Sequence, residues 1–359
     1  MRLRLRLRVR LIAGIAMRRR YPNVLAAALA AAVFVSCIAG APACAQAPTV
    51  RVRLAEIARQ DVFLPLYGAL GKGLLRREGL SVTNKVTLGP DQTLAALLSG
   101  DADIALGGPD MAISSAINAH GEKVKIIAAI SRFEGSFLVA HDGTAPQPFP
   151  WDLLKGKSLM GWHAGTFPAV FVESALRNRH IDPLADIRYR PNIPYPARMG
   201  LWREKRTDFA TFSLVDAARL EREKAGYAVA SIGVAAGPSV YAVFLATAEY
   251  IRGHPDAIQK WANAIQAALR WTATAPVEDL VAVAARYLPR AAPTDLATAF
   301  RRYRPLDMWQ TDPTVGRDAI AKVQAMLIDS GVMAADRRVA YETVVEPRFA
   351  ENAKRAARQ

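Results

Sequence analysis

Apolar and polar positions alternate with two periods along most of the chain, and these periods predict helices and strands in turn. One stretch near residue 100 shows both. Leu94, Leu97 and Leu98 have the i, i+3, i+4 spacing of a helix face, and a serine-glycine pair follows where a helix can end. The mostly apolar residues 103–106 then predict a short strand that is buried on both faces. The stretch therefore has the pattern of an α/β sheet.

The same alternation extends in both directions and predicts strands and helices that follow one another up to about residue 246. The expected strands are residues 49–57, 80–88, 103–106, 124–131, 136–140, 158–161, 187–189, 208–212, 229–232 and 240–246. The expected helices are residues 63–77, 91–98, 111–119, 167–179, 197–205, 215–224, 255–273, 277–287, 294–303 and 313–330.

A change of composition at residues 142–150, with a glycine and three prolines, interrupts this alternation and predicts a crossing between two lobes. We therefore expect an α/β protein with two lobes and a helical carboxyl-terminal part. The expected division is residues 46–145 for the first part of lobe 1 and 146–237 for lobe 2. Residues 238–359 then return to lobe 1 as a strand and the carboxyl-terminal helices.

The first 45 residues predict a secretory signal peptide. Eight arginines precede or flank an uncharged apolar run at residues 24–40, and small residues follow, so we expect cleavage after Ala45. Met17 is an alternative start, because the three arginines after it and the apolar run form a complete signal. A lipoprotein acylated at Cys37 or Cys44 is a competing interpretation, although the residues before each cysteine fit it poorly. An uncleaved anchor is another, but the run is short for a membrane-spanning helix.

Composition limits the chemistry of the exported chain. Both cysteines precede the cleavage site, so it would hold neither a disulfide nor a thiolate metal site. The formal charge of +15 falls to +7 for residues 46–359 once the eight arginines are removed. The remaining arginine pairs lack interleaved aromatic residues, so we expect no nucleic-acid partner. The five histidines form no close metal-binding pair, and we expect neither a metal nor a cofactor.

Five segments, each modest alone, have an order and spacing that point to one family: residues 68–82, 97–110, 133–140, 151–161 and 250–271. With these segments the chain, from about residue 50 to 350, resembles the nitrate/sulfonate/taurine and thiamine-precursor binding proteins, the SsuA/THI5-like family of ABC-transporter solute receptors. The resemblance implies a type II periplasmic-binding-protein fold whose lobes close over a small solute. It also implies a monomer in the periplasm that serves an ABC permease and ATPase in the inner membrane.

Carried onto this sequence, the resemblance implies that the solute contacts turns that follow the strands. In the first lobe these residues are Asp61, Phe63, Gly108, Pro109, Asp110, Ser131 and Arg132. In the second they are Trp162, His163, Gly165, Thr166, Phe167, Thr211 and Phe212, and Tyr241 on the returning strand joins them.

The chemistry expected there is recognition without turnover, with a preference for an anion. Gly165 and Thr166 begin a helix, and a helix N-terminus favours a negative charge by ~0.3–1 kcal/mol. Arg132 could add charge-assisted hydrogen bonds to a sulfonate, nitrate or carboxylate. Asp61 and Asp110 leave the opposite choice open, because they could cap helices or bind a cationic amine.

Each of these roles has a structural alternative. Arg132 could instead pair with Glu134 at the surface. Trp162, Phe167 and Phe212 could cover the body of the solute or simply pack in the core.

Two other functional classes remain. Thiamine-precursor synthases resemble this fold, but they depend on a cysteine-rich iron-binding stretch that the exported chain would lack. The sequence also contains no G-x-S-x-G elbow and no phosphate-binding loop of the P-loop type. We therefore expect no enzyme activity. A sensor that signals to a membrane partner uses the same closed lobes, and the sequence does not separate sensing from transport.

Overall fold

The computed structural model describes residues 49–119 and 123–359, which lie in the compact unit Pro48–Gln359. The predicted signal peptide, its cleavage site and both cysteines lie outside the described residues. Within the described ranges, no helix is long and apolar enough to cross a bilayer.

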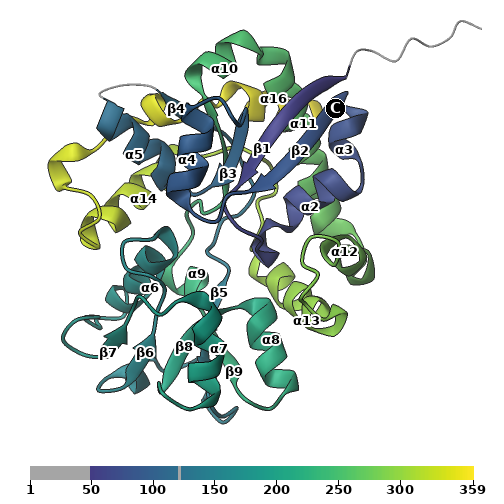
Figure 1. The fold of residues 1–359 in the computed structure, drawn as a ribbon. Coiled ribbons are helices and arrows are strands. Elements are labelled where there is room, and N and C mark those ends of the chain that lie inside the picture. Colours follow the sequence, from purple (N-terminus) through teal and green to yellow (C-terminus); the bar gives the residue numbers. More distant parts are fainter. Residues whose placement is uncertain (1–48, 120–122) are drawn as a thin grey trace, which may run out of the picture. The chain divides into compact units, whose positions relative to one another are not determined.

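Two five-stranded sheets organise this unit (Figure 1). The strands of the first are Val50–Glu56 (β1), Leu80–Val86 (β2), Ile104–Gly107 (β3), Val124–Ala129 (β4) and Val243–Thr247 (β10), in the order β2-β1-β3-β10-β4. Those of the second are Ser136–Ala140 (β5), Ser158–Met160 (β6), Arg188–Arg190 (β7), Phe209–Ser213 (β8) and Tyr227–Ser231 (β9), in the order β7-β6-β8-β5-β9. The α/β class is confirmed. Each sheet is mainly parallel, as predicted, and is mixed only because β10 and β5 run antiparallel to both of their neighbours.

Helices flank both sheets, and most begin close to the predicted positions. They are Leu64–Gly71 (α2), Leu74–Arg77 (α3), Pro90–Leu98 (α4), Asp110–Ala119 (α5), Phe167–Arg177 (α6), Tyr195–Arg203 (α7), Leu214–Arg222 (α8), Ile232–Ala236 (α9), Ala248–Gly253 (α10), Pro255–Thr274 (α11), Val277–Ala284 (α12), Pro293–Tyr303 (α13), Arg317–Asp329 (α14), Tyr341–Val344 (α15) and Arg348–Ala356 (α16). Short 3-10 turns cover Asp61–Phe63 (η1), Trp151–Leu154 (η2), Arg304–Leu306 (η3) and Ala335–Arg337 (η4).

The helix expected over residues 63–77 is interrupted. Gly73 has a φ of 67°, a left-handed conformation that ends α2 and lets the chain turn into α3. The apolar spacing is continuous across this break, which is why the periodicity alone predicts a single helix.

The crossing between the lobes was predicted in the wrong place. Strand β5 pairs with β8 and β9 in the second sheet, so the chain leaves the first sheet after β4, at residues 130–135. Residues 142–150 form a loop within the second lobe instead. Hydrophobic pattern does not distinguish the two sheets, because a buried strand looks the same in either. The return strand lies in the first sheet, at Val243–Thr247 instead of 240–246.

Three segments run side by side where the chain passes between the sheets, and we call residues 130–132, 239–242 and 308–310 the crossing ribbon. The backbone N–H of Tyr241 donates to the carbonyl of Ser131 at 3.1 Å, and that of Arg132 donates to the carbonyl of Met308 at 3.0 Å. The side-chain oxygen of Ser131 also accepts a hydrogen bond from Ala242 N at 3.0 Å. A bridge between Ser131 and Trp309 completes the ribbon.

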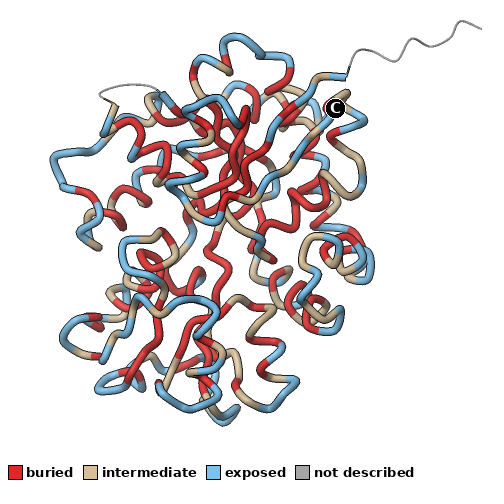
Figure 2. The backbone as a smooth tube through the Cα atoms, in the orientation of Figure 1, coloured by how far each residue is buried: buried red, intermediate tan, exposed pale blue. Residues whose placement is uncertain are grey.

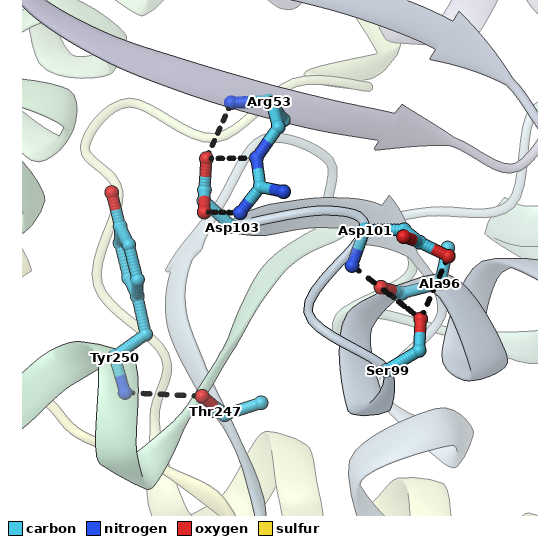
Figure 3. Close-up of polar contacts among 7 residues, drawn as sticks. All are labelled: Arg53, Ala96, Ser99, Asp101, Asp103, Thr247 and Tyr250. Carbon is cyan, nitrogen blue, oxygen red and sulfur yellow. Dashed lines mark hydrogen bonds and ion pairs between the residues drawn. The ribbon is translucent and has the colours of Figure 1, made fainter.

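Polar contacts fix the start of β3 against β1 (Figure 3). The carboxylate of Asp103 accepts hydrogen bonds from the backbone N–H and the guanidinium of Arg53, with an Nη2–Oδ1 distance of 2.5 Å. The strand itself is buried, as are the central strands of both sheets (Figure 2). This anchoring places Gly107 and the start of α5 at the carboxyl end of β3, the edge at which ligands of open α/β sheets bind.

The carboxyl-terminal helices contact both lobes, so residues 238–359 are not confined to lobe 1. Helix α12 packs against α2, whereas α13 packs against α8 and α14 against α6 in the second lobe. Two bidentate ion pairs join α8 to α13. Arg222 pairs with Asp295 at 2.8 and 3.0 Å, and Arg302 pairs with Glu221 at 2.8 and 2.6 Å.

Candidate functional site

Asp61 begins η1 in the first lobe and is buried. Its Oδ1 accepts from the N–H of Val62 at 3.0 Å, and its Oδ2 accepts from the N–H of Val215 at 3.0 Å. Val215 is the second residue of α8, so Asp61 lies at the N-terminus of a helix in the other lobe. Burial raises the pKa of Asp61 to about 6 although the hydrogen bond from Val215 opposes the shift. Asp61 therefore caps helix α8, which is one of the roles expected for it. The hydrogen bond from Val215 joins the two lobes.

Glu134 lies on residues 130–135, which we call the crossing segment, and is 3% exposed. Its Oε2 accepts hydrogen bonds from Ser136, from the N–H at 2.8 Å and from the hydroxyl at 2.6 Å. Burial raises the pKa of Glu134 to about 7, and the negative charge of Asp61 adds to the shift. Sequence reasoning considered Glu134 only as a surface partner of Arg132, but no ion pair joins these two described residues, and Glu134 is buried.

Asp110 begins α5 directly after the first sheet. Its Oδ1 is buried and has no hydrogen-bond partner among the described residues. A Cβ added at Gly108 would lie 2.1 Å from this oxygen and 2.9 Å from Cδ1 of Phe167, so only glycine allows this close approach. Burial raises the pKa of Asp110 to about 6, against hydrogen bonds from its own N–H and that of Met111.

Two tyrosines lie close to these acids, and we call Asp61, Asp110 and Glu134 the carboxylate cluster. Burial, and then the charges of Glu134, Asp110 and Asp61, raise the pKa of Tyr241. Burial and the charges of Asp61 and Glu134 likewise raise the pKa of Tyr303. The hydroxyl of Tyr303 donates to the carbonyl of Gly135 at 2.6 Å. Tyr241 is 6% exposed, and no hydrogen bond within the described ranges reaches its hydroxyl.

Aromatic side chains from the second lobe border this cluster. Phe167, the first residue of α6, stacks on Tyr241 with ring centroids 5.7 Å apart and planes at 8°. Trp162 Nε1 donates to the hydroxyl of Ser136 at 3.2 Å, and the Trp162 ring stacks on Tyr195 at 6.0 Å. The polar atoms and the rings thus come from both lobes.

A buried arginine supports the second-lobe turns, and sequence reasoning missed it. Arg198 is 1% exposed, and its Nη2 donates to the carbonyls of Thr211 at 2.5 Å and Met160 at 3.2 Å, while Nη1 donates to the carbonyl of Gly161. Burial lowers its pKa to about 10. Its guanidinium lies 4.7 Å from the centre of the Trp162 ring. In the sequence, Arg198 lies four residues before Trp202, and this helical spacing indicates that both side chains lie on the inner face of α7.

The remaining predicted residues lie elsewhere or serve the local structure. The hydroxyl of Thr166 donates to the carbonyl of His163 at 2.6 Å, and both His163 and Gly165 are exposed. The Thr211 hydroxyl contacts Arg198, and Phe212, Phe63 and Pro109 are buried. Arg132 lines a separate pocket of about 340 Å³ together with Ser239, Gln310 and Lys322. The structure thus brings together Asp61, Asp110, Tyr241, Phe167 and Trp162 from the predicted set.

Because the pKa values of the three acids are raised, the free energy of unfolding should fall as pH rises. Between their ordinary pKa values of 3.8 and 4.5 and the raised values of about 6 to 7, the folded chain binds more protons than the unfolded chain. Each such group then removes about 1.4 kcal/mol of stability per pH unit within its window. Urea unfolding of the solute-free protein at pH 5 and 7.5 measures the effect. Glu134→Gln should flatten the profile, and a stability that rises with pH would contradict the assignment.

Within the described residues, no group of three or more histidine, cysteine, aspartate or glutamate side chains could hold a metal ion.

Known proteins share this fold. The sequence profile of the family described as NMT1/THI5 like matches residues 60–279. YtlA of Bacillus subtilis (strain 168), which carries the name of a binding protein, is 29% identical over 312 residues, covering 86% of this chain and 92% of its own. The aliphatic sulphonate binding protein SsuA of Escherichia coli superposes with a TM-score of 0.66 at 16% identity, covering 83% of this chain and 98% of its own. The nitrate-binding protein NrtA of Synechocystis PCC 6803 gives 0.64 at 14% identity, with 86% and 89% covered.

Proposed function

Because the chain belongs to the NMT1/THI5-like family, we propose that it is the solute-binding receptor of an ABC importer. It captures one small solute between its two lobes and hands it to a membrane permease that an ATPase drives. The structural neighbours are periplasmic binding proteins for sulphonate and nitrate, which supports a binding role. The observation that carries the proposal is the carboxylate cluster with Tyr241, where polar groups at the lobe junction are buried and partly unpartnered.

The location of these groups fits capture by closure. Asp61 and Asp110 follow strands of the first sheet, Glu134 lies on the crossing segment, and Trp162 and Phe167 follow a strand of the second. A ligand that touches both sets gains contacts only when the lobes approach each other, so its binding favours the closed arrangement. The crossing ribbon is the place where the chain would bend.

Export to the periplasm is part of the proposal. It rests on the predicted signal peptide and on relatives that are periplasmic. Transport is favoured over sensing, since the neighbour from Staphylococcus aureus is the ligand-binding component of an ABC-type import system. That protein has a TM-score of 0.65 at 15% identity and covers 85% of this chain.

We expect the protein to bind one solute per chain and to release it unchanged. The test is a thermal-shift screen of residues 46–359 against sulfonates, nitrate, carboxylates, pyrimidines and amines, followed by mass spectrometry of the incubated ligand. Saturating ligand stabilises a receptor by about 2.7 kcal/mol at a hundred times Kd, which moves the unfolding midpoint visibly. A chemically modified product would show an enzyme instead, and the absence of any stabilising compound, with none released on denaturation, would reject a receptor.

A further inference from the structure

We infer that the solute is an organic cation, an ammonium or amidinium group on a small aromatic or aliphatic body, and that the carboxylate cluster binds its positive end. This inference rests on the proposed receptor function and names the class of solute for the same site. It departs from the anion expected on the strength of Arg132, Gly165 and Thr166.

The balance of charge around the cluster is the first argument. Asp61, Asp110 and Glu134 bring three carboxyl groups to one buried region that includes Tyr241. Arg198 is the buried cation nearest to Trp162, and its two Nη atoms already donate to main-chain carbonyls while the indole ring covers it. Only its Nε is buried without a partner among the described residues. An anion would therefore enter next to three acids, whereas the Nη donors of the nearest buried cation among the described residues are already engaged. A cation would supply the missing counter-charge.

No ion pair within the described residues joins a basic side chain to the carboxylate cluster, which strengthens this argument. Arg132 and Lys322 line their own pocket beside Ser239. In the lobe facing the cluster, Thr166 uses its hydroxyl within its own turn, and Gly165 is exposed. Of the features that favoured an anion in the sequence, only the start of α6 at Phe167 borders the carboxylate cluster. The Arg132 side chain and the Thr166 hydroxyl have other partners or surroundings.

Two polar groups without partners give a second, independent argument. Asp110 Oδ1 is buried without a hydrogen bond among the described residues. The hydroxyl of Tyr241 has no hydrogen bond within the described ranges either, although this residue keeps 6% of its surface exposed. A buried acceptor that lacks a donor costs about 1–3 kcal/mol, so most buried acceptors in native proteins have a hydrogen-bond partner. An ammonium or amidinium carries several N–H donors and could satisfy both oxygens, whereas a sulfonate or nitrate offers none.

The neighbouring rings suit the body of such a solute. The stacked rings of Phe167 and Tyr241 are nearly parallel, and Phe171 packs edge-on against both at 5.1 and 5.5 Å. The faces of aromatic rings attract cations, and their hydrophobic area favours an apolar body. Carboxylates and rings together therefore select a positive, partly apolar molecule.

The test compares probes that share one body and differ in charge. Benzylammonium and benzamidinium should each raise the unfolding midpoint of residues 46–359 saturably, and isothermal titration should give one site. Benzenesulfonate, benzoate and benzyl alcohol should have no effect at equal concentration. Zinc chloride is added as a metal probe and should also have none.

Variants locate the site. Asp110→Asn and Glu134→Gln keep the side-chain shape but remove a charge, so each should weaken binding of the cationic probe about tenfold or more. Tyr241→Phe should weaken it less, since it removes a neutral acceptor. Asp152→Asn is the matched control, because its side chain is 79% exposed and its loss of charge should leave the affinity unchanged.

The outcomes separate this inference from the receptor function. Binding of benzenesulfonate or benzoate, but not of the cations, would overturn the inference and leave a receptor. Equal affinity of Asp110→Asn, Glu134→Gln and Asp152→Asn would overturn it as well. Failure of every probe would reject the inference, while the broader screen with native solutes decides separately whether the protein is a receptor.

Discussion

Arg198→Met should lower the free energy of unfolding by about 4 kcal/mol, the largest effect we expect from any single substitution here. The guanidinium donates to the carbonyls of Met160, Gly161 and Thr211, and methionine cannot replace these hydrogen bonds. Burial of an acceptor without a donor costs about 1–3 kcal/mol each. Chemical denaturation monitored by tryptophan fluorescence gives the change directly.

Two further variants test the cause of this loss. Arg198→Lys keeps the charge but lacks the planar fork that reaches several carbonyls, so it should fall between wild type and Arg198→Met. Arg188→Met is the control, because Arg188 is 65% exposed and its 3.4 Å pair with Asp208 should be worth less than about 1 kcal/mol. If Arg198→Met were as stable as Arg188→Met, the buried guanidinium would have no structural role.

Gly233→Ala should destabilise the protein by about 3 kcal/mol and disturb the crossing segment. A Cβ at position 233, in α9, would lie 2.3 Å from the carbonyl oxygen and 2.7 Å from the nitrogen of Glu134. Both are backbone atoms, so no side-chain rotation relieves the overlap. The shift would displace Glu134 from Ser136, and the variant should also lose affinity for the solute.

Gly200→Ala is the matched control for this substitution. Gly200 is exposed within α7 and has no atom within 4 Å of an added Cβ. Alanine should therefore stabilise the helix by about 0.5–1 kcal/mol. A Gly233→Ala protein with the stability of Gly200→Ala would show that α9 moves freely away from the crossing segment.

Local patterns were sufficient for the alternation of strands and helices but not for the assignment of strands to sheets. The helices around Leu94–Leu98 and residues 255–273 were predicted within a few residues because their apolar spacing is local. Strand β5 was placed in the wrong lobe, since its five buried residues carry no sign of their partners. The short helices α9 and α10 were missed, because five or six residues are too few to show a helical period.

The candidate site was only partly accessible to sequence reasoning, for the same physical reason. Asp61 and Asp110 were selected because the family resemblance places the solute at turns that follow strands, and Tyr241 because it lies on the returning strand. The structure places all three around one buried region. Glu134 and Arg198 are also buried charged residues of this region. From the sequence alone, a charged side chain is expected at the surface, so neither was selected. Burial of a charged side chain depends on distant partners, which a single sequence does not show.

Separation of the two sheets would also bend the chain outside the crossing ribbon. Besides the three segments of the ribbon, residues 285–292 connect α12, which packs on α2, to α13, which the ion pairs of Arg222 and Arg302 hold against α8. A lobe that is connected to the other at several points has little freedom to twist and would rotate about one axis. Each opening would then follow the same path, and stiffening the connection at residues 285–292 would slow opening without changing a residue of the carboxylate cluster.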